Sequence, residues 1–453
     1  MNISRNMPRL GLVAATLALG CGIEPRVALD ASPQDAADAT IDATAVDTPP
    51  GTPAIATVAI VGQDDNQVRQ GTGRVRIRIT GSDLAAPLSV AVEGDAAAII
   101  SATDSEILAD WTILHGATPG PRGVIVQTPG GLDSLLNAVS VTPITVGPLG
   151  ADSTARGTTS TPFRTISAAL RVAGPDDTVF VRDGQYGDLD VWPLYIGSRI
   201  HLQGESRAGV RIAASPTTEG IAVYEGAVVE SFTVTGQTRC IVMNGATARN
   251  FSATDCAIGV VVQGLGGTVQ DASIGATTIG IYGLLGTNGT DSTRLAVERV
   301  DVTRSSGTYD TWAGLRLQCS GGGPALISNV TITDTAPAAG LSAAVALSSD
   351  QGGAPVQLWN VTLLGSVNAL RISGVPNVEL RMSSSAMSIG GAAGIAGACI
   401  ADERQSPAVG SAPLVHLGGV SVCGQVQTSG IVTGPAQSRP FYYIREAGSA
   451  IEF

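Results

Sequence analysis

Three arginines and one aspartate lie close together in the last third of the chain: Arg299, Asp301, Arg304 and Arg316. Eliminating a uronic acid requires a base for its C5 proton and a cation that neutralises its carboxylate, and this cluster offers cations and a possible calcium ligand. In this segment, however, the charged residues alternate with Val300 and Val302. Such alternation is typical of a strand whose charged side chains face solvent. We therefore interpret the cluster as solvated surface.

A second set of side chains could bind a sugar without reacting with it. Four inserts lengthen the chain between expected strands, at 283–295, 304–312, 333–341 and 348–355. Loops of a solenoid collect on one face, and binding often occurs there. Aromatic rings can stack on a pyranose, and charged groups can hydrogen-bond to its hydroxyls. Two inserts contain candidate ligand-binding residues of these kinds: Asp291, Arg294, Tyr309, Asp310 and Trp312. The alternative is that Trp312 only packs its loop onto the solenoid.

The composition argues against several other chemistries. All 26 basic residues are arginine, which removes mechanisms that need a lysine base, a Schiff base or a phosphate-loop lysine. His201 and His416 each stand between two large apolar residues, so both should point outward from their strands. No spacing of cysteine and histidine is typical of a zinc site. We therefore expect no metal, no cofactor and no catalytic residue.

The N-terminal residues have the pattern of an export signal. Arg5 and Arg9 precede an apolar run over 10–19, which is too short to span a bilayer. The run leads into Leu-Ala-Leu-Gly-Cys at 17–21, which resembles a bacterial lipobox, although Ala18 stands where leucine is usual. The resemblance implies a signal peptide over 1–21 and acylation at Cys21. The membrane is then a partner, through a lipid anchor at the outer membrane or cell surface.

Residues 22–52 consist mainly of Ala, Asp, Thr and Pro. Such a segment cannot bury enough apolar surface to fold, so we expect a disordered stalk. The stalk has six acidic residues against Arg26 alone, so part of the formal net charge of −12 belongs to a solvated tether. The overall charge also argues against nucleic acid as a partner, because phosphates require a basic surface.

Residues 53–145 contain short alternating strands separated by turns, as in Val75-Arg76-Ile77-Arg78-Ile79. This pattern predicts a small β-sandwich. Residues 79–84, 117–120 and 126–131 resemble the IPT/TIG immunoglobulin-like family. That resemblance implies a spacer or adhesive module without chemistry of its own.

Residues 146–453 contain a repeat of the form φ-x-x-φ-x-φ, where φ is apolar. Its central residue recurs every 19 to 31 positions: Phe232, Phe251, Ala272, Val300, Val330 and Val361. A second apolar strand follows each, including Ile279–Ile281 and Leu315–Leu317. Two strands and a tight turn at this period predict a right-handed parallel β-helix, with coils about 4.8 Å apart. The expected fold class is thus all-β, a small Ig-like sandwich followed by this solenoid.

The residue before each central position supports the same fold. These residues are Ser231, Asn250, Asp271, Arg299, Asn329 and Asn360. Asparagine tolerates the left-handed backbone that a sharp corner needs. Stacked asparagine amides can also hydrogen-bond from coil to coil. We therefore expect a corner of the β-helix at this position.

The start of the solenoid resembles a known group. Residues 157–170, followed by 176–186, are similar to the opening of pectin-lyase-like β-helices, including an uncharacterised domain family. One apolar helical face within this opening should cap the open end of the solenoid: Ile166, Ala169, Leu170 and Ala173. Asp176 and Asp177 could be read as a catalytic pair, but their place before the first strand favours a role in a turn.

The resemblance raises the question of enzyme activity. The chondroitinase B and alginate lyase group, whose opening this one resembles, uses a lysine base, and this chain has none. Polygalacturonases have clustered aspartates beside His-Gly and Arg-Ile-Lys segments, which are also missing. Pectate lyases can use arginine with calcium, for which only the cluster around Arg299 could serve.

Apart from Cys21 the chain has five cysteines, so at least one is unpaired within a monomer. Two pairs are separated by about one coil and are candidate disulfides: Cys240 with Cys256, and Cys399 with Cys423. Export permits both bonds. Cys319 is in phase with Leu315 and Leu317, which predicts a buried thiol.

Taken together, these patterns predict a non-catalytic cell-surface lipoprotein that binds a glycan or a surface protein, or serves a structural or adhesive role. The alternative is a divergent polysaccharide lyase or glycoside hydrolase of the pectin-lyase-like superfamily. Carboxylates and arginines gathered in one groove would favour the enzyme, whereas scattered charges would favour binding.

Overall fold

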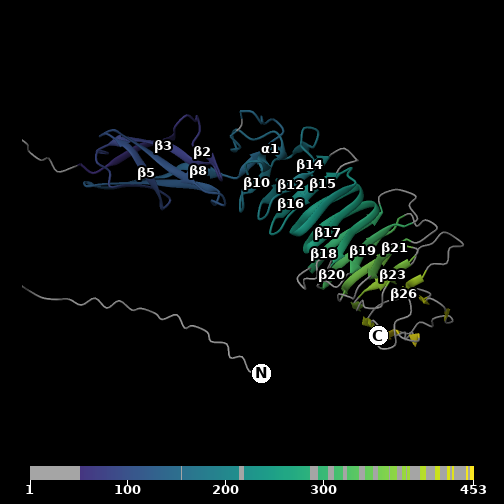
Figure 1. Ribbon diagram of the computed structural model, residues 1–453. Coiled ribbons are helices and arrows are strands. Elements are labelled where there is room, and N and C mark those ends of the chain that lie inside the picture. Colours follow the sequence, from purple (N-terminus) through teal and green to yellow (C-terminus); the bar gives the residue numbers. More distant parts are fainter. Residues whose placement is uncertain are drawn as a thin grey trace, which may run out of the picture. The chain divides into compact units, whose positions relative to one another are not determined.

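The computed structural model shows a β-sandwich followed by a parallel β-helix (Figure 1). It describes residues 51–452 except 155, 214–218, 286–293, 305–310, 320–323, 336–341, 350–355, 367, 375–379, 384, 388–397, 405–413, 419–425, 429–430, 433–444 and 447–448. Beyond 397 only the backbone of strands is described. Cys21, the expected signal peptide and nearly all of the expected stalk lie outside the described residues. Within the described part, every helix is too short or too polar to span a membrane.

The first part is a β-sandwich. Its strands are β1 (Ala54–Ile60), β2 (Gln67–Arg69), β3 (Gly73–Ser82), β4 (Ser89–Val92), β5 (Asp95–Ala102), β6 (Glu106–Ile113), β7 (Gly120–Thr128) and β8 (Gly131–Thr142). Strands β1, β3 and β6 pair on one side and β4, β7 and β8 on the other, while β5 pairs with β6 and β4 and so joins the two sides. Strand β2 adds to β8 in parallel.

Alternation along the strands builds the sandwich core. In β3 the residues Val75, Ile77 and Ile79 are buried while the arginines between them are exposed. Trp111 of β6 and Val126 of β7 belong to the same buried cluster. This arrangement is the predicted one, because a strand with one apolar face must bury that face against a second sheet.

The second part is a parallel β-helix, seen in Figure 1 as stacked teal and green coils. Its strands are β9 (Ile144–Val146), β10 (Thr178–Val181), β11 (Gly184–Tyr186), β12 (Leu194–Ile196), β13 (His201–Gly204), β14 (Val210–Ala213), β15 (Glu219–Val223), β16 (Val228–Thr235), β17 (Arg239–Leu285), β18 (Arg294–Arg304), β19 (Ala313–Cys319), β20 (Ala325–Thr333), β21 (Ala343–Ser349), β22 (Val356–Leu364), β23 (Asn368–Gly374), β24 (Leu380–Ser383), β25 (Ala386–Met387), β26 (Ala398–Arg404), β27 (Leu414–Gly418), β28 (Val426–Thr428), β29 (Ile431–Val432), β30 (Arg445–Glu446) and β31 (Ser449–Glu452).

The repeat predicts the stacking of the coils correctly. Phe232 pairs with Phe251, and Val300 pairs with Val330, in parallel register. The two phenylalanine rings stack inside the solenoid with their centroids 5.9 Å apart. The expected fold class, a β-sandwich followed by a parallel β-helix, is therefore confirmed.

Every predicted corner residue adopts the left-handed backbone. The six φ angles are +62° at Ser231, +50° at Asn250, +51° at Asp271, +54° at Arg299, +54° at Asn329 and +53° at Asn360. Side chains at these corners also bond between coils. Asn360 Nδ2 donates to Asn329 Oδ1 at 2.7 Å, and Asn250 Nδ2 donates to Ser231 Oγ at 3.0 Å.

The register of one second strand differs from the predicted one. The sequence repeat aligns Ile279 with Leu315, but the structure pairs Ile279 with Ala313 and Ile281 with Leu315. The predicted register differs from the observed one by two residues. Strand alternation has a period of two, so the predicted and the observed registers both place an apolar residue inward. As a consequence, Tyr282 and not Gly280 lies opposite Arg316.

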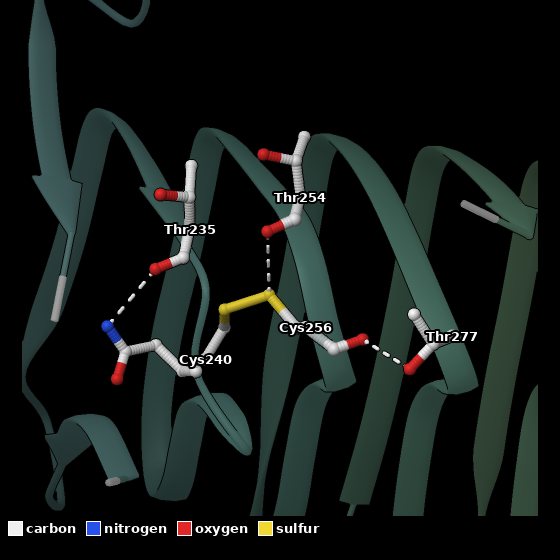
Figure 2. The surroundings of a disulfide bond; sticks show 6 residues. Thr235, Cys240, Thr254, Cys256 and Thr277 are labelled. Atoms are coloured by element: carbon white, nitrogen blue, oxygen red, sulfur yellow. Dashed lines mark hydrogen bonds between the residues drawn. A yellow bond between two sulfur atoms is a disulfide. The ribbon is translucent and has the colours of Figure 1, made fainter. Parts of the chain in front are cut away.

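A disulfide joins Cys240 to Cys256 across neighbouring coils, with both side chains buried in the interior (Figure 2). The Cα atoms are 5.9 Å apart, within the usual range for this bond. Cys256 Sγ also lies 3.4 Å from the carbonyl oxygen of Thr254. Cys423 and the side chains of Cys319 and Cys399 lie outside the described residues.

Helix α1 (Ile166–Leu170) is the expected cap helix, although it has only one full turn. Thr165 is its N-cap and accepts from the N–H of Ala168 at 3.1 Å. Ile166 and Ala169 are buried in the same cluster as the solenoid interior, with Leu170 and Ala173 packed against them. The short helix therefore covers apolar residues of the first coils.

The left-handed corners generate a prediction about stability. Replacing Asn360 with valine should lower the free energy of unfolding by about 1–2 kcal/mol, because a left-handed backbone costs other residues roughly that amount. Asn360→Gly loses the amide bond but keeps the backbone conformation, so its loss should be smaller. Urea unfolding followed by circular dichroism measures both, and Thr362→Val in the same strand is the control. Equal losses at positions 360 and 362 would contradict the role of the corner.

Candidate functional site

Trp312 is not available to a ligand. Its side chain is 0% exposed and belongs to the buried interior of the solenoid. The indole N–H donates to the carbonyl oxygen of Ala276 at 3.2 Å. A Cβ atom at Gly314 would lie 2.1 Å from Ile332 Cγ2 and 3.2 Å from the end of the indole ring, so the interior around Trp312 has no space for a side chain at that position. The prediction that Trp312 contacts a sugar is therefore wrong, because the ring turns inward to fill the coil.

The other candidates from the inserts are not brought together by the described residues. Asp291, Tyr309 and Asp310 lie outside them. Arg294 is exposed at the first position of β18, where its backbone pairs with Gly266. The proposed site in the inserts thus stays a prediction without Trp312.

The arginine cluster is divided among different environments. Arg299 is exposed at its corner, and its Nε donates to Asp271 Oδ1 at 2.6 Å, which holds the pKa of that carboxyl below its usual value. Arg304 is only 2% exposed and forms an ion pair at 3.4 Å with Asp334, which is 3% exposed. The expectation that Arg304 faces solvent is therefore wrong. A buried ion pair at this position has a structural role.

A different surface gathers groups suited to a ligand. It lies on the outward side of the second strand of each coil, where β12, β15, β17, β19, β21 and β23 follow one another (Figure 1). We define the tyrosine face by four side chains: Tyr195, Tyr282 and Arg316 on these strands, and Tyr224 directly after β15. Leu194, Ile196 and Leu315 point inward and are buried, so strand alternation holds Tyr195 and Arg316 on the outside.

Tyr195 and Tyr224 form an exposed aromatic pair on adjacent coils. Their ring centroids are 6.4 Å apart with an interplanar angle of 22°. The residues are 58% and 40% exposed. The backbone N–H of Tyr224 donates to the carbonyl oxygen of Ile196 at 3.1 Å, which joins the two coils beside the rings. The pair is therefore an accessible aromatic surface at the edge of two paired strands.

Tyr282 and Arg316 form a second pair farther along the solenoid. The guanidinium carbon of Arg316 lies 5.9 Å from the ring centroid of Tyr282, a cation–π distance. The Tyr282 hydroxyl donates to Gln318 Oε1 at 2.9 Å. Both contacts restrict the side chains, so less entropy is lost when a ligand binds.

Sequence reasoning missed the three tyrosines for an identifiable reason. The shifted register placed Gly280 at the outward position that Tyr282 occupies, opposite Arg316. Tyr195 lies in β12, before the first repeat that was aligned. Tyr224 could not be found by alignment either, because the residue opposite Tyr195 in the neighbouring strand is Ala222, and the two tyrosine rings meet only in the folded structure.

Another polar group lies on the outward side of β13, β16 and β17. Glu230 accepts from Arg249 Nε at 2.5 Å and lies 2.8 Å from His201 Nε2. Burial by itself would raise the pKa of this carboxyl, but the hydrogen bond from Arg249 and the charge of His201 outweigh burial and lower it. The pair of partners therefore keeps Glu230 ionised, which suits an ion pair better than a proton donor.

A concavity beside helix α1 contains a carboxylate, Asp190, whose pKa is raised and not lowered. It is lined by Asp190 together with Arg164 and Tyr186. Burial raises the pKa of Asp190. The same carboxylate accepts the N–H of Ser167 at 2.8 Å and that of Gly187 at 3.1 Å. Asp190 is thus engaged in holding α1 against the chain that follows β11.

Metal ligands do not gather in the part of the chain that the structure describes. There, no group of three or more His, Cys, Asp or Glu side chains could hold a metal ion. Asp176 and Asp177 serve turns, as expected: Asp176 has a φ of +68°, and Asp177 accepts the N–H of Gly174 at 2.9 Å. Both aspartates therefore belong to the turn before β10.

The ion contacts of Glu230 predict a dependence of stability on pH. Because the folded pKa is below the unfolded one, these contacts stabilise the protein above the unfolded pKa, and their contribution is lost as the pH falls through the folded value. Glu230→Gln should therefore lower the melting temperature at neutral pH and reduce its decline towards acid. Glu106→Gln, which breaks an exposed ion pair with Arg78, is the control. A pH profile of Glu230→Gln parallel to that of the wild type would contradict this role.

Residues 149–293 match a family described as a protein of unknown function, DUF1565. No curated protein matches the chain. Several solved structures are similar at low identity, among them the following three. "The complex structure of XylC with xylose" is 10% identical, over 63% of this chain and 71% of that one, with a TM-score of 0.44. The A-module of the mannuronan C-5 epimerase AlgE4 of Azotobacter vinelandii is 13% identical, over 63% and 94%, with a TM-score of 0.33. The catalytic domain of a GH87 α-1,3-glucanase, in complex with tetrasaccharides, is 11% identical, over 84% and 92%, with a TM-score of 0.32. The sugars and activities named there belong to those proteins.

Proposed function

We propose that the protein is an exported, lipid-anchored surface protein whose β-helix binds a glycan through the tyrosine face without catalysing a reaction. The observation that carries this proposal is the exposed, stacked pair of Tyr195 and Tyr224. Aromatic side chains are usually buried when a chain folds, so two adjacent exposed rings at the edge of two paired strands indicate a surface that something covers.

The chemistry of the pair favours a sugar. A tyrosine ring covers the C–H face of a pyranose, and its hydroxyl hydrogen-bonds at the edge. Tyrosine also loses little conformational entropy on binding, because only two side-chain angles must be fixed. The nearly parallel rings of Tyr195 and Tyr224 extend this surface across two coils. A flat aromatic surface is the shape that a sugar ring needs.

The second pair on the face adds polar contacts. Arg316 can donate several hydrogen bonds to hydroxyls or carboxylates, and its position over Tyr282 limits the directions in which it points. Coils of a β-helix are about 4.8 Å apart, so side chains on successive coils would meet successive parts of an extended chain. We therefore propose that the ligand is a polysaccharide lying along the solenoid axis.

A polysaccharide lyase or hydrolase is the alternative. Asp190 is the described carboxylate best suited to proton transfer, because burial raises its pKa and it lines a concavity with Arg164. Its two backbone contacts already occupy it in the fold. Release of unsaturated uronates or reducing ends from pectate, alginate or glycosaminoglycans, abolished by Asp190→Asn, would favour the enzyme.

The tyrosine face generates a prediction about binding. The double variant Tyr195→Ala with Tyr224→Ala should weaken polysaccharide binding about tenfold or more, since exposed aromatics that anchor a ligand contribute at least roughly 1.4 kcal/mol. The melting temperature should change little, because both rings are exposed. A glycan array identifies the ligand, and affinity electrophoresis in the matching polysaccharide measures the loss.

The control for this experiment is Trp359→Ala. Trp359 is 52% exposed on β22, a strand that does not contribute to the tyrosine face. If the tyrosines contact the ligand, Trp359→Ala should bind the polysaccharide as tightly as the wild type does. The tyrosine face would be ruled out if both variants lost the same amount of affinity, or if the tyrosine double variant bound like the wild type.

The anchor is a separate part of the proposal and rests on the lipobox-like residues 17–21. We expect Cys21 to be acylated, so a clickable fatty acid should label the wild-type protein in cells but not Cys21→Ser. The wild type should also fractionate with the membrane and the variant should not. Labelling of both proteins to the same extent would refute acylation at this residue.

A further inference from the structure

The sandwich leads into the β-helix without a linker. Strand β8 ends at Thr142, and after Pro143 the chain enters β9, whose three residues are fully buried. Strand β9 pairs in parallel with β10, with Ile144 opposite Val179. Residues 144–146 are therefore the first rung of the solenoid, two residues before the expected boundary at 146.

The other edge of this first rung is covered by residues 157–163. Thr145 donates its N–H to the carbonyl oxygen of Gly157 at 2.9 Å and accepts from the N–H of Phe163 at 2.9 Å. The N–H of Gly147 donates to the carbonyl oxygen of Phe163 at 2.8 Å. A bare strand edge pairs readily with other chains. The segment 157–163 blocks that edge.

The sandwich in turn holds the covering segment in place. Asp65 accepts from Arg156 Nη2 at 2.8 Å and also from the hydroxyl of Ser160. Gln67 Oε1 accepts the N–H of Ser160 at 3.3 Å. A continuous set of contacts thus runs from the sandwich, through the covering segment, to β9.

Two buried polar side chains join the sandwich to the turn before β10. Gln70 donates from Nε2 to the carbonyl oxygen of Ala117 at 2.8 Å and accepts at Oε1 from the N–H of Thr178 at 2.9 Å. Asp177 is fully buried and accepts the N–H of Gly116 at 2.8 Å, with His115 Nδ1 at 2.5 Å. A buried polar group without partners costs about 1–3 kcal/mol, and more if it is charged. Gln70 Oε1 and Asp177 Oδ1 keep these partners only while the two parts stay together.

From these contacts we infer that the β-sandwich is the N-terminal cap of the β-helix, and that it opens together with the first coils. It would thus have a role beyond that of the spacer or adhesive module that the resemblance to the IPT/TIG family implies. The inference concerns how the β-helix is closed and does not depend on glycan binding.

Hydrogen exchange followed by mass spectrometry tests the cap in the full-length chain. The double variant Asp65→Ala with His115→Ala removes contacts from the sandwich side only and leaves every residue of the β-helix unchanged. It should raise amide exchange about tenfold or more in 157–163, β9 and β10, because these amides then open at a lower free energy. Exchange in β20 and β22, far along the solenoid, should stay at the wild-type rate.

Two comparisons keep this test decisive. Glu106→Gln breaks an ion pair inside the sandwich and should leave exchange in β9 and β10 unchanged. Asp177→Asn keeps the shape of the buried side chain but removes its charge, so it should raise exchange in the same segments if the double variant fails to fold. Wild-type exchange in β9 and β10 of these junction variants would overturn the inference. The inference would also be overturned if, in the wild-type protein, the core amides of the sandwich exchanged independently of the amides of the first coils.

Discussion

The β-helix depends on one backbone constraint, repeated in every aligned coil. The chain must turn sharply inside the φ-x-x-φ-x-φ repeat while the apolar residues on both sides of the turn stay in the interior. A left-handed residue at the corner achieves this turn, and six successive coils place one there, from Ser231 to Asn360. Because the corners stack, their side chains can bond between coils, as Asn329 and Asn360 do. The strand register, the buried interior and the outward tyrosines all follow from this corner.

Much of this fold could be predicted from the sequence, because two local rules act together in each repeat. Alternation decides which side chains point inward, and the polar corner residue marks where the chain turns. Only the second strand was aligned wrongly at Ile279, since a shift of two residues leaves alternation unchanged. The local sequence pattern therefore does not distinguish the two registers. In the observed register a Cβ atom at position 280 would lie 2.2 Å from Val302 Cγ1, so only glycine fits there.

The candidate site was harder to predict, because exposure depends on contacts distant in the sequence. Trp312 looked like a loop aromatic, yet its ring is buried and its N–H donates to the carbonyl oxygen of Ala276, thirty-six residues earlier in the chain. Arg304 looked solvated, yet it lies beside Asp334, thirty residues later in the chain. Tyr195 and Tyr224 are conspicuous only once their coils are stacked and their rings meet. The residue types were visible in the sequence, but their partners were not.

The disulfide between Cys240 and Cys256 has a mechanical consequence. In a solenoid each coil is held only by its neighbours, so unwinding advances from an end one coil at a time. The bond closes a stretch of 16 residues across two neighbouring coils. Force applied from the N-terminal side passes through the bond from Cys240 to Cys256, so the residues between the two cysteines cannot be extended while the bond is intact. The bond thus removes this loop from the length of chain that mechanical unfolding can release.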